Sequence, residues 1–266
     1  MPTAAADVWA SGDAYEPYVG RWSRLVAREF LAWLAVPPGA AWLDVGCGTG
    51  ALTSVILADA APARVEAVDP ALPYLRFAET RVRDPRAIFV NADAQALPQP
   101  TQSIDAAVSA LALNFIPDPQ AAVAEMARVT AAGGVIAAYV WDYAGEMQLM
   151  RRFWDAAAAL DPHAATLDEA RRFPICHPAA LESLFRGARL QNVETRAIDV
   201  PTCFVDFDDY WRPFLGGQGP APTYAMALSD ERRAALSERI RKALPVAADG
   251  SIDLIARAWA VRGRRA

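Results

Sequence analysis

The stretch AWLDVGCGTGALT, residues 41–53, decides the fold, because three glycines in five positions directly follow a short apolar run. The run AWLDV lies between a Pro-Gly pair and a glycine, which predicts a short buried strand. Glycine lets the backbone turn tightly and approach a ligand closely. A strand, a glycine turn and a helix in this order indicate a loop that cradles an adenosine-type cofactor.

Strands and helices alternate around this stretch. The apolar spacing of Trp22, Val26 and Phe30 predicts a helix over 22–35 that ends at VPPG. Further helices are expected at 50–60 and 71–83, and after Asp118, with Asp118 as N-cap, Pro119 in the first turn and Gly133-Gly134 as the end. The expected strands are 41–45, 64–69, 87–93, 104–113 and 135–141. This alternation predicts an α/β fold with a doubly wound, mostly parallel sheet.

The regular alternation of strands and helices ends after residue 141. We expect a helix over 146–160, a helix, glycine turn and strand over 181–200, and a last strand over 249–263. Between those two strands lie about fifty residues rich in aromatics, glycine and proline, too many for a simple hairpin loop. We interpret this insertion as a cap or a lid.

Composition limits the class of protein. With 54% apolar and 21% charged residues, a chain of 266 residues can bury a sizeable core. Its net charge of -5 argues against a nucleic-acid partner. Three cysteines without a CxxC pair indicate neither a disulfide framework nor a zinc site, so we predict no metal and a cytoplasmic location. We expect no signal peptide and no membrane span, because the apolar runs are too short to cross a bilayer.

Acidic residues follow the predicted strands where a ligand is expected. In an open parallel sheet, ligands bind beyond the carboxyl ends of the strands. Asp69 ends the second strand, where it could accept hydrogen bonds from both ribose hydroxyls. Asp93 follows the third, where it could accept one from an adenine amino group or merely cap a turn. The segment 109–113, SALAL, closes the fourth strand and lines the remaining side.

The cofactor is either a dinucleotide or S-adenosylmethionine. GCGTGA fits the dinucleotide pattern G-x-G-x-x-A, and Asp69 lies 19 positions after Gly50, near the expected offset. Asp44, however, stands just before the glycines, where it would repel a pyrophosphate but attract a cationic aminoacyl sulfonium. The chain also has very few lysines and no Tyr-x-x-x-Lys pair for hydride transfer. These features favour S-adenosylmethionine.

The chain resembles the class I S-adenosylmethionine-dependent methyltransferases, and within them the small-molecule group that includes the ubiquinone/menaquinone biosynthesis enzymes. The resemblance is carried by LDVGCGTG, AVDP, NADAQALP, IDAAVSALALNFIPDP and MARVTAAGGVIAAYVW. It implies a Rossmann-like seven-stranded sheet of order 3-2-1-4-5-7-6 with helices on both faces and an antiparallel seventh strand. We expect a single methyltransferase domain over 1–266, with a cofactor-binding core at 15–141 and cap elements at 142–190 and 201–250.

The resemblance also assigns roles to residues. Asp44 and the glycine loop would face the methionine part of the cofactor, Asp69 the ribose, and Asp93 with Ala94 the adenine. Tyr18 and Arg21 would close over the cofactor, with the Arg21 guanidinium pairing its carboxylate; an ordinary salt bridge is the alternative for Arg21. The predicted cofactor-binding set is Tyr18, Arg21, Asp44, Gly46, Cys47, Gly48, Gly50, Asp69, Pro70, Asp93, Ala94, Ser109 and Leu111.

Methyl transfer from a sulfonium is an in-line displacement, so positioning and desolvation are the main tasks of the protein. A general base is needed only if the acceptor must lose a proton, and the candidates are Asp142, Tyr143 and His177. For Asp142 and His177 the alternative is helix capping. Asn114 stands where relatives often have a histidine, and Asn cannot act as a base near neutral pH. The predicted substrate-side residues are Asn114, Phe115, Trp141, Tyr210 and Trp211, although plain core packing explains the aromatic ones equally well.

The sequence therefore predicts an enzyme that transfers a methyl group from S-adenosylmethionine to O, N or C of a small organic acceptor, releasing S-adenosylhomocysteine. Two alternatives stay open, a NAD(P)-dependent oxidoreductase and a non-catalytic protein that binds an adenosyl ligand. Methylation of nucleic acid or protein is disfavoured, because no basic groove and no NPPY-type loop after the fourth strand are visible.

Overall fold

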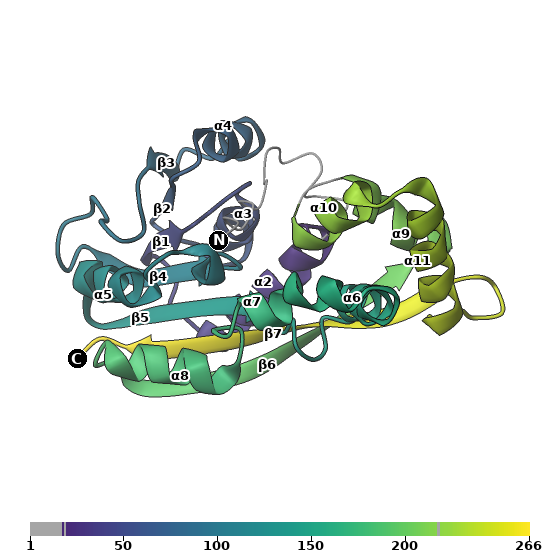
Figure 1. Cartoon of the computed structure of the whole chain (residues 1–266). Coiled ribbons are helices and arrows are strands. Elements are labelled where there is room, and N and C mark those ends of the chain that lie inside the picture. Colours follow the sequence, from purple (N-terminus) through teal and green to yellow (C-terminus); the bar gives the residue numbers. More distant parts are fainter. Residues whose placement is uncertain (1–17, 19, 217–218) are drawn as a thin grey trace. The chain divides into compact units, whose positions relative to one another are not determined.

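The computed structural model describes residues 18, 20–216 and 219–266, and a seven-stranded sheet is its main feature (Figure 1). The strand order is β3-β2-β1-β4-β5-β7-β6. The pairs β1–β2, β1–β4, β2–β3 and β4–β5 are parallel, whereas β7 runs antiparallel to β5. The strands are β1 (Ala41–Val45), β2 (Arg64–Asp69), β3 (Ala87–Asn91), β4 (Ile104–Ala110), β5 (Thr130–Trp141), β6 (Gln191–Phe204) and β7 (Ile252–Arg264). The predicted fold class and strand order are confirmed.

The chain divides into two compact units. The sheet unit comprises 22–141, 175–198 and 258–266. The cap unit comprises the described residues up to 21, together with 142–174 and 199–257. Of the segment 142–190, which the sequence assigns to the cap, residues 175–190 thus belong to the sheet unit. The first residues of the predicted core, 15–17, lie outside the described residues.

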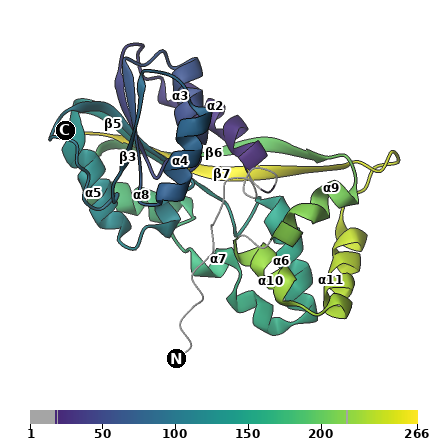
Figure 2. The ribbon, with the colours of Figure 1, turned by 90° about the horizontal axis from the view of Figure 1, so that it is seen from above.

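Helices lie on both faces of the sheet. In Figure 2, α2, α3 and α4 lie on one face and α5 and α8 on the other. The helical elements here are α2 (Arg21–Leu34), α3 (Ala51–Asp59), α4 (Leu72–Arg81), the 3-10 helix η2 (Leu113–Phe115), α5 (Pro119–Val129) and α8 (Pro178–Gly187). The apolar stripe of α2 is buried as its spacing predicts, and Phe30 packs edge-on against Tyr139 of β5 at 4.8 Å between ring centroids.

The central strands form the core because their residues are apolar on both faces. All five residues of β1 are buried, including Asp44, and in β4 Ile104 and the residues from Ala106 to Ser109 are buried. A parallel strand covered on both faces needs a continuous apolar run rather than an alternating one. Asp44 is therefore the exception that requires an explanation.

The end of the helix after Asp118 differs from the prediction. Asp118 caps α5 as expected, since its carboxylate accepts a hydrogen bond from the Ala121 backbone N–H at 2.9 Å. The helix ends at Val129, however, and Gly133-Gly134 lie inside β5, where its register with β4 shifts. Gly133 has φ 75°, and a Cβ on Gly134 would lie 2.7 Å from the Asp105 carbonyl oxygen. The two glycines thus allow an irregularity within the strand. Glycine is typical of such irregularities as well as of helix ends.

The cap unit is mostly helical and rich in aromatic contacts. Its helices are α6 (Gln148–Leu160), η3 (Pro162–Thr166), α7 (Glu169–Arg172), α9 (Phe207–Trp211), η4 (Arg212–Gly216), α10 (Pro220–Ala227) and α11 (Asp230–Ala243). Phe153 of α6 stacks on Phe214 at 4.6 Å, and Phe214 also contacts Tyr210. The predicted insertion is therefore helical, and its aromatic side chains pack together with Phe153 of α6. Among the described residues, no helix is both long enough and apolar enough to span a bilayer.

Candidate cofactor site

The glycine loop connects β1 to α3 with a backbone that other residues tolerate poorly. Gly46, Gly48 and Gly50 have φ of 73°, 51° and 79°. At Gly46 two features exclude a side chain: the positive φ, and the position of a Cβ, which would lie 2.5 Å from the Cβ of Ala112. The backbone N–H groups of Gly46 and Cys47 donate to the Val68 carbonyl of β2, at 2.8 and 3.0 Å. The loop is therefore held against the end of the neighbouring strand.

Asp44 is a fully buried carboxyl group with one unpartnered oxygen. Its Oδ2 accepts a hydrogen bond from the Thr53 hydroxyl at 2.6 Å, whereas Oδ1 has no partner among the described residues. Burial raises the pKa of Asp44 to about 7, against the stabilising hydrogen bonds from Thr53. Such a group gains most from a cation placed beside it, since opposite charge favours the ionised form.

Asp69 connects the end of β2 to the glycine loop. Its Oδ2 accepts a hydrogen bond from the Gly48 N–H at 2.9 Å, and its Oδ1 accepts one from the Ala71 N–H at 2.8 Å. Burial raises the pKa of Asp69, and these two donors partly oppose that effect. Since a carboxylate offers about four lone-pair sites, further donors such as two hydroxyls can still be accepted.

The last residue of β3 and the residues after it form an ordered turn beside Asp69. Asn91 donates from its side-chain amide to the carbonyls of Asp69 and Pro70, at 2.9 and 3.0 Å. Asp93 is exposed, and Gln95 donates to it from its backbone and from its side chain, at 2.8 and 3.0 Å to Oδ1, which lowers the pKa of Asp93. The capping role considered for Asp93 is thus present, and its carboxylate remains solvent-accessible.

Other polar groups near these strand ends are buried without partners. Within the described part of the chain, the Ser109 hydroxyl and both polar atoms of the Asn114 amide have none, although native proteins satisfy most buried polar groups. Leu111, between them, adopts φ 56° while its N–H donates to the Tyr139 carbonyl at 2.8 Å. Groups of this kind are expected where a ligand completes the hydrogen bonding.

Tyr74 was not among the residues predicted from the sequence. This residue lies in the first turn of α4, its hydroxyl is buried without a partner in the described structure, and its pKa is raised to about 12 by burial and by the charge of Asp69. Its place in the sequence, five positions after the acidic residue that ends β2, could have indicated that it lies near the site. Cys47, which was predicted, is buried against Ala67 and Leu75.

Two predicted cofactor residues belong to the cap unit. The Arg21 guanidinium pairs with the Asp209 carboxylate at 3.0 Å and lies over the Phe204 ring, 4.7 Å from its centroid. Tyr18 is buried, and its hydroxyl has no partner among the described residues. The salt bridge that was the alternative for Arg21 is therefore formed.

Each of the three candidate bases makes a structural contact that does not depend on a catalytic role. Asp142 accepts hydrogen bonds from the backbone N–H groups of Gly145 and Glu146, at 3.1 and 3.0 Å, and so closes a turn. His177 caps α8, since its Nδ1 accepts from the Ala179 N–H at 3.3 Å. Tyr143 is buried, with its ring 6.0 Å from that of Phe173. A role as general base stays a prediction for all three.

The aromatic substrate-side candidates are mostly buried. Trp141 is 2% exposed at the end of β5, and the Tyr210 hydroxyl donates to the Leu149 carbonyl at 2.9 Å. Trp211 is partly exposed and stacks on Phe207, and Phe115 is 39% exposed. Of this set, Trp211 and Phe115 are thus the aromatic side chains with surface available for an acceptor.

Known proteins resemble the chain in sequence and in fold. Residues 43–138 match a family model described as methyltransferase domain. A demethylmenaquinone methyltransferase of Roseiflexus sp. (strain RS-1) is 32% identical over 182 residues, covering 62% of this chain and 74% of that protein. The YcgJ protein of Bacillus subtilis superposes with a TM-score of 0.57 at 18% identity, covering 90% of this chain and 97% of that one. Phosphoethanolamine N-methyltransferase 2 of Haemonchus contortus, solved with phosphomonomethylethanolamine and S-adenosylhomocysteine, has a TM-score of 0.57 at 16% identity, covering 95% of this chain and 56% of that one.

Proposed function

Because the chain belongs to the class I S-adenosylmethionine-dependent methyltransferases, we propose that the strand ends of its sheet unit hold this cofactor for methyl transfer to a small organic acceptor. The observation that carries the assignment is the group of buried, unpartnered polar atoms beside the glycine loop, on Asp44, Ser109 and Asn114. A ligand with several donors and acceptors would satisfy them, and a protein without a ligand there gains nothing from keeping them buried.

Each part of the cofactor has a matching group. Asp44 would face the cationic aminoacyl end, because its charge is otherwise unbalanced in the buried strand. Asp69 would accept hydrogen bonds from the ribose hydroxyls, and Asp93 with Ala94 would contact the adenine. Bound S-adenosylmethionine supplies an electrophilic methyl group, so the tasks left to the protein are to orient the acceptor and exclude water.

A nicotinamide dinucleotide fits these groups less well. Its pyrophosphate would lie against the glycine loop, beside the carboxyl group of Asp44, and the two negative charges would repel each other. The oxidoreductase alternative also has no relative among the proteins compared above. These observations favour S-adenosylmethionine over a nicotinamide dinucleotide.

For the acceptor, a hydroquinone ring is the first class to test, since the Roseiflexus relative is named for demethylmenaquinone. A flat aromatic ring of this kind could stack on a partly exposed aromatic side chain of the sheet unit, Phe115. The net charge of -5 disfavours a nucleic-acid acceptor. The free thiols of all three cysteines are compatible with the cytoplasm.

Calorimetric titration tests the cofactor assignment. Wild-type protein is titrated separately with S-adenosylmethionine, S-adenosylhomocysteine, NAD and NADP, beside Asp69→Ala and a control, Asp59→Ala. Asp59 is an exposed acid at the end of α3 in the same unit, paired with Arg28 at 3.5 Å. We expect binding of the first two ligands only, lost in Asp69→Ala and kept in the control. Binding of NAD or NADP instead, or equal binding by Asp69→Ala, would contradict the proposal.

A further inference from the structure

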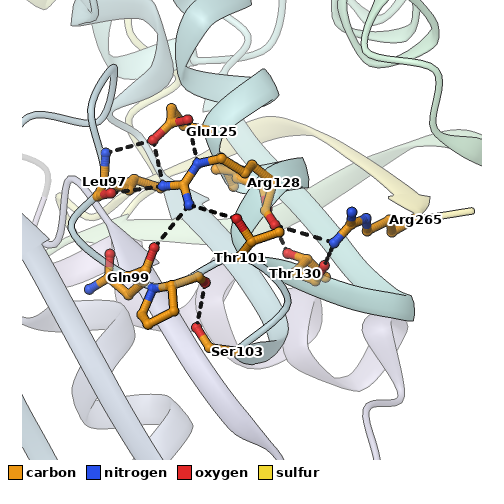
Figure 3. Close-up of polar contacts among 10 residues, drawn as sticks. Leu97, Gln99, Thr101, Ser103, Glu125, Arg128, Thr130 and Arg265 are labelled. Atoms are coloured by element: carbon orange, nitrogen blue, oxygen red, sulfur yellow. Dashed lines mark hydrogen bonds and ion pairs between the residues drawn. The ribbon is translucent and has the colours of Figure 1, made fainter.

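Arg128 of α5 holds the loop that carries the predicted adenine-binding residues. This loop, residues 92–103, connects β3 to β4 without a helix or strand of its own. Figure 3 shows the guanidinium reaching into it. Nη2 donates to the Leu97 carbonyl at 2.8 Å, and Nη1 donates to the Gln99 carbonyl at 3.0 Å and to the Thr101 hydroxyl at 3.3 Å. One side chain thus fixes three positions of an otherwise irregular segment.

Glu125, one turn earlier in α5, binds both this guanidinium and the loop. We call the ion pair of Glu125 and Arg128 the clamp. Glu125 accepts hydrogen bonds from Arg128 Nε at 2.7 Å and Nη2 at 2.8 Å, and from the Leu97 backbone N–H at 2.9 Å (Figure 3). Leu97 is therefore bound at both its N–H and its carbonyl by the same ion pair. The fork geometry of arginine is required for this, because lysine offers a single point charge.

A second set of contacts connects the clamp to Asp93. Gln95 donates to the Asp93 carboxylate, and its Oε1 accepts from the N–H of Asp118, the residue that caps α5, at 3.1 Å. The loop is consequently tied to the beginning of α5 near Asp93 and to its last turn near Leu97. At that last turn, Arg265, which directly follows β7, donates to the carbonyls of Arg128 and Thr130 and so supports the backbone of the clamp.

We propose that Arg128 is a positioning residue for the cofactor, which orients Asp93 and Ala94 toward the adenine without touching the ligand. The inference rests on the proposed function and extends it to a residue outside the binding site. Its physical basis is that an irregular loop loses conformational entropy when a ligand orders it, unless the protein has already ordered it. The clamp thus supports both affinity for the cofactor and discrimination of its adenine amino group.

The test compares Arg128→Met with Arg186→Met. Methionine keeps the apolar stem and removes the donors. Arg186 forms an equally short pair with Glu182, at 2.6 Å, but on the exposed surface of α8. The Kd values for S-adenosylhomocysteine and for its inosine analogue, which lacks the adenine amino group, are measured by calorimetry. For Arg128→Met we expect a roughly tenfold rise in the Kd for S-adenosylhomocysteine, which is the size expected for the loss of a charge-assisted hydrogen bond. We also expect this variant to prefer S-adenosylhomocysteine over the inosine analogue less strongly than the wild type does.

Arg128→Lys and Glu125→Gln extend the test. Lysine keeps the charge but cannot form the fork, so Arg128→Lys should bind nearly as weakly as Arg128→Met. Amide hydrogen exchange over 92–103 should rise in each clamp variant and stay unchanged in Arg186→Met. If Arg128→Met fails to fold, Glu125→Gln gives the same comparison, because it keeps the shape of the side chain.

The outcomes separate this inference from the proposed function. Wild-type binding of S-adenosylhomocysteine together with an unchanged Kd and an unchanged preference in the clamp variants would overturn the role of Arg128 alone. Loss of thermal stability with unchanged preference for the adenine form would mean that Arg128 is purely structural, which also overturns it. Failure of the wild-type protein to bind S-adenosylhomocysteine overturns both proposals.

Discussion

Replacing Asp44 by asparagine should have opposite effects on stability and on cofactor binding. Asp44 is buried in β1 with one oxygen unpartnered, and its pKa is raised from 3.8 to about 7. In the folded protein the proton is therefore retained at pH values where the unfolded chain has lost it. The free energy of unfolding must then fall as the pH rises from about 4 to about 7.

The size of the effect follows from the two pKa values. A rise from 3.8 to about 7 corresponds to roughly 4 kcal/mol in full, of which more than half develops between pH 5 and pH 8. Asparagine imitates the protonated carboxyl group and can still accept from the Thr53 hydroxyl. Asp44→Asn should therefore be more stable than the wild type at pH 8, and this difference in unfolding free energy should fall by more than half at pH 5.

Binding should change in the other direction. Without the negative charge, we expect S-adenosylmethionine to bind at least ~10-fold more weakly at pH 8. The affinity of the wild type should rise between pH 6 and pH 8, because Asp44 must lose its proton to face a cation, whereas that of Asp44→Asn should stay flat.

Urea unfolding at pH 5 and pH 8, combined with calorimetry at both, measures the two effects, and Asp59→Asn serves as the exposed control. A stability difference between Asp44→Asn and the wild type that does not depend on pH would refute the reasoning about burial. Unchanged affinity in Asp44→Asn would refute the assignment of Asp44 to the cationic end.

Two further predictions concern single side chains. Gly46→Ala combines φ 73° with a Cβ placed 2.5 Å from that of Ala112, so we expect a loss of roughly 2–4 kcal/mol in unfolding free energy and no detectable S-adenosylhomocysteine binding; a wild-type melting temperature would contradict this. Burial raises the pKa of Glu169 in the cap unit to about 7, so its ionisation lowers stability as the pH rises above 4.5. Glu169→Gln should therefore melt at a higher temperature than the wild type at pH 8 and at nearly the same temperature at pH 5, as followed by circular dichroism, and an equal shift at both pH values would show that ionisation is not the cause.

Most of the sheet unit could be predicted from local sequence. The strands at 41–45 and 64–69 begin and end where the apolar runs do, because buried parallel strands need continuous apolar residues and glycine or proline at their ends. The cap of α5 at Asp118 followed from Asp-Pro in the same way. The glycine pair at 133–134 was assigned wrongly, since glycine marks helix ends and strand irregularities alike, and only the register with β4 distinguishes them.

The candidate site could be proposed from the sequence where a residue type follows a strand end, and not where contacts join remote segments. Asp44, Asp69 and Asp93 could be selected because each stands directly at or after a strand of a parallel sheet. Tyr74 and Arg128 could not, because nothing in a helix sequence says which loop its side chains reach. Arg21 shows the same limit, since its contact with Asp209 joins positions 188 residues apart.

The sequence by itself determined the order of the strands and helices, the glycine turn and the acids that surround it, because these depend on apolar spacing and on backbone conformations that only certain residues adopt. The tertiary structure alone decided which polar groups are left without partners, how far burial raises the pKa of Asp44, and which loop Arg128 holds. Those properties depend on distances between segments remote in the chain, which fold together only when the apolar faces pack, and no local pattern encodes them.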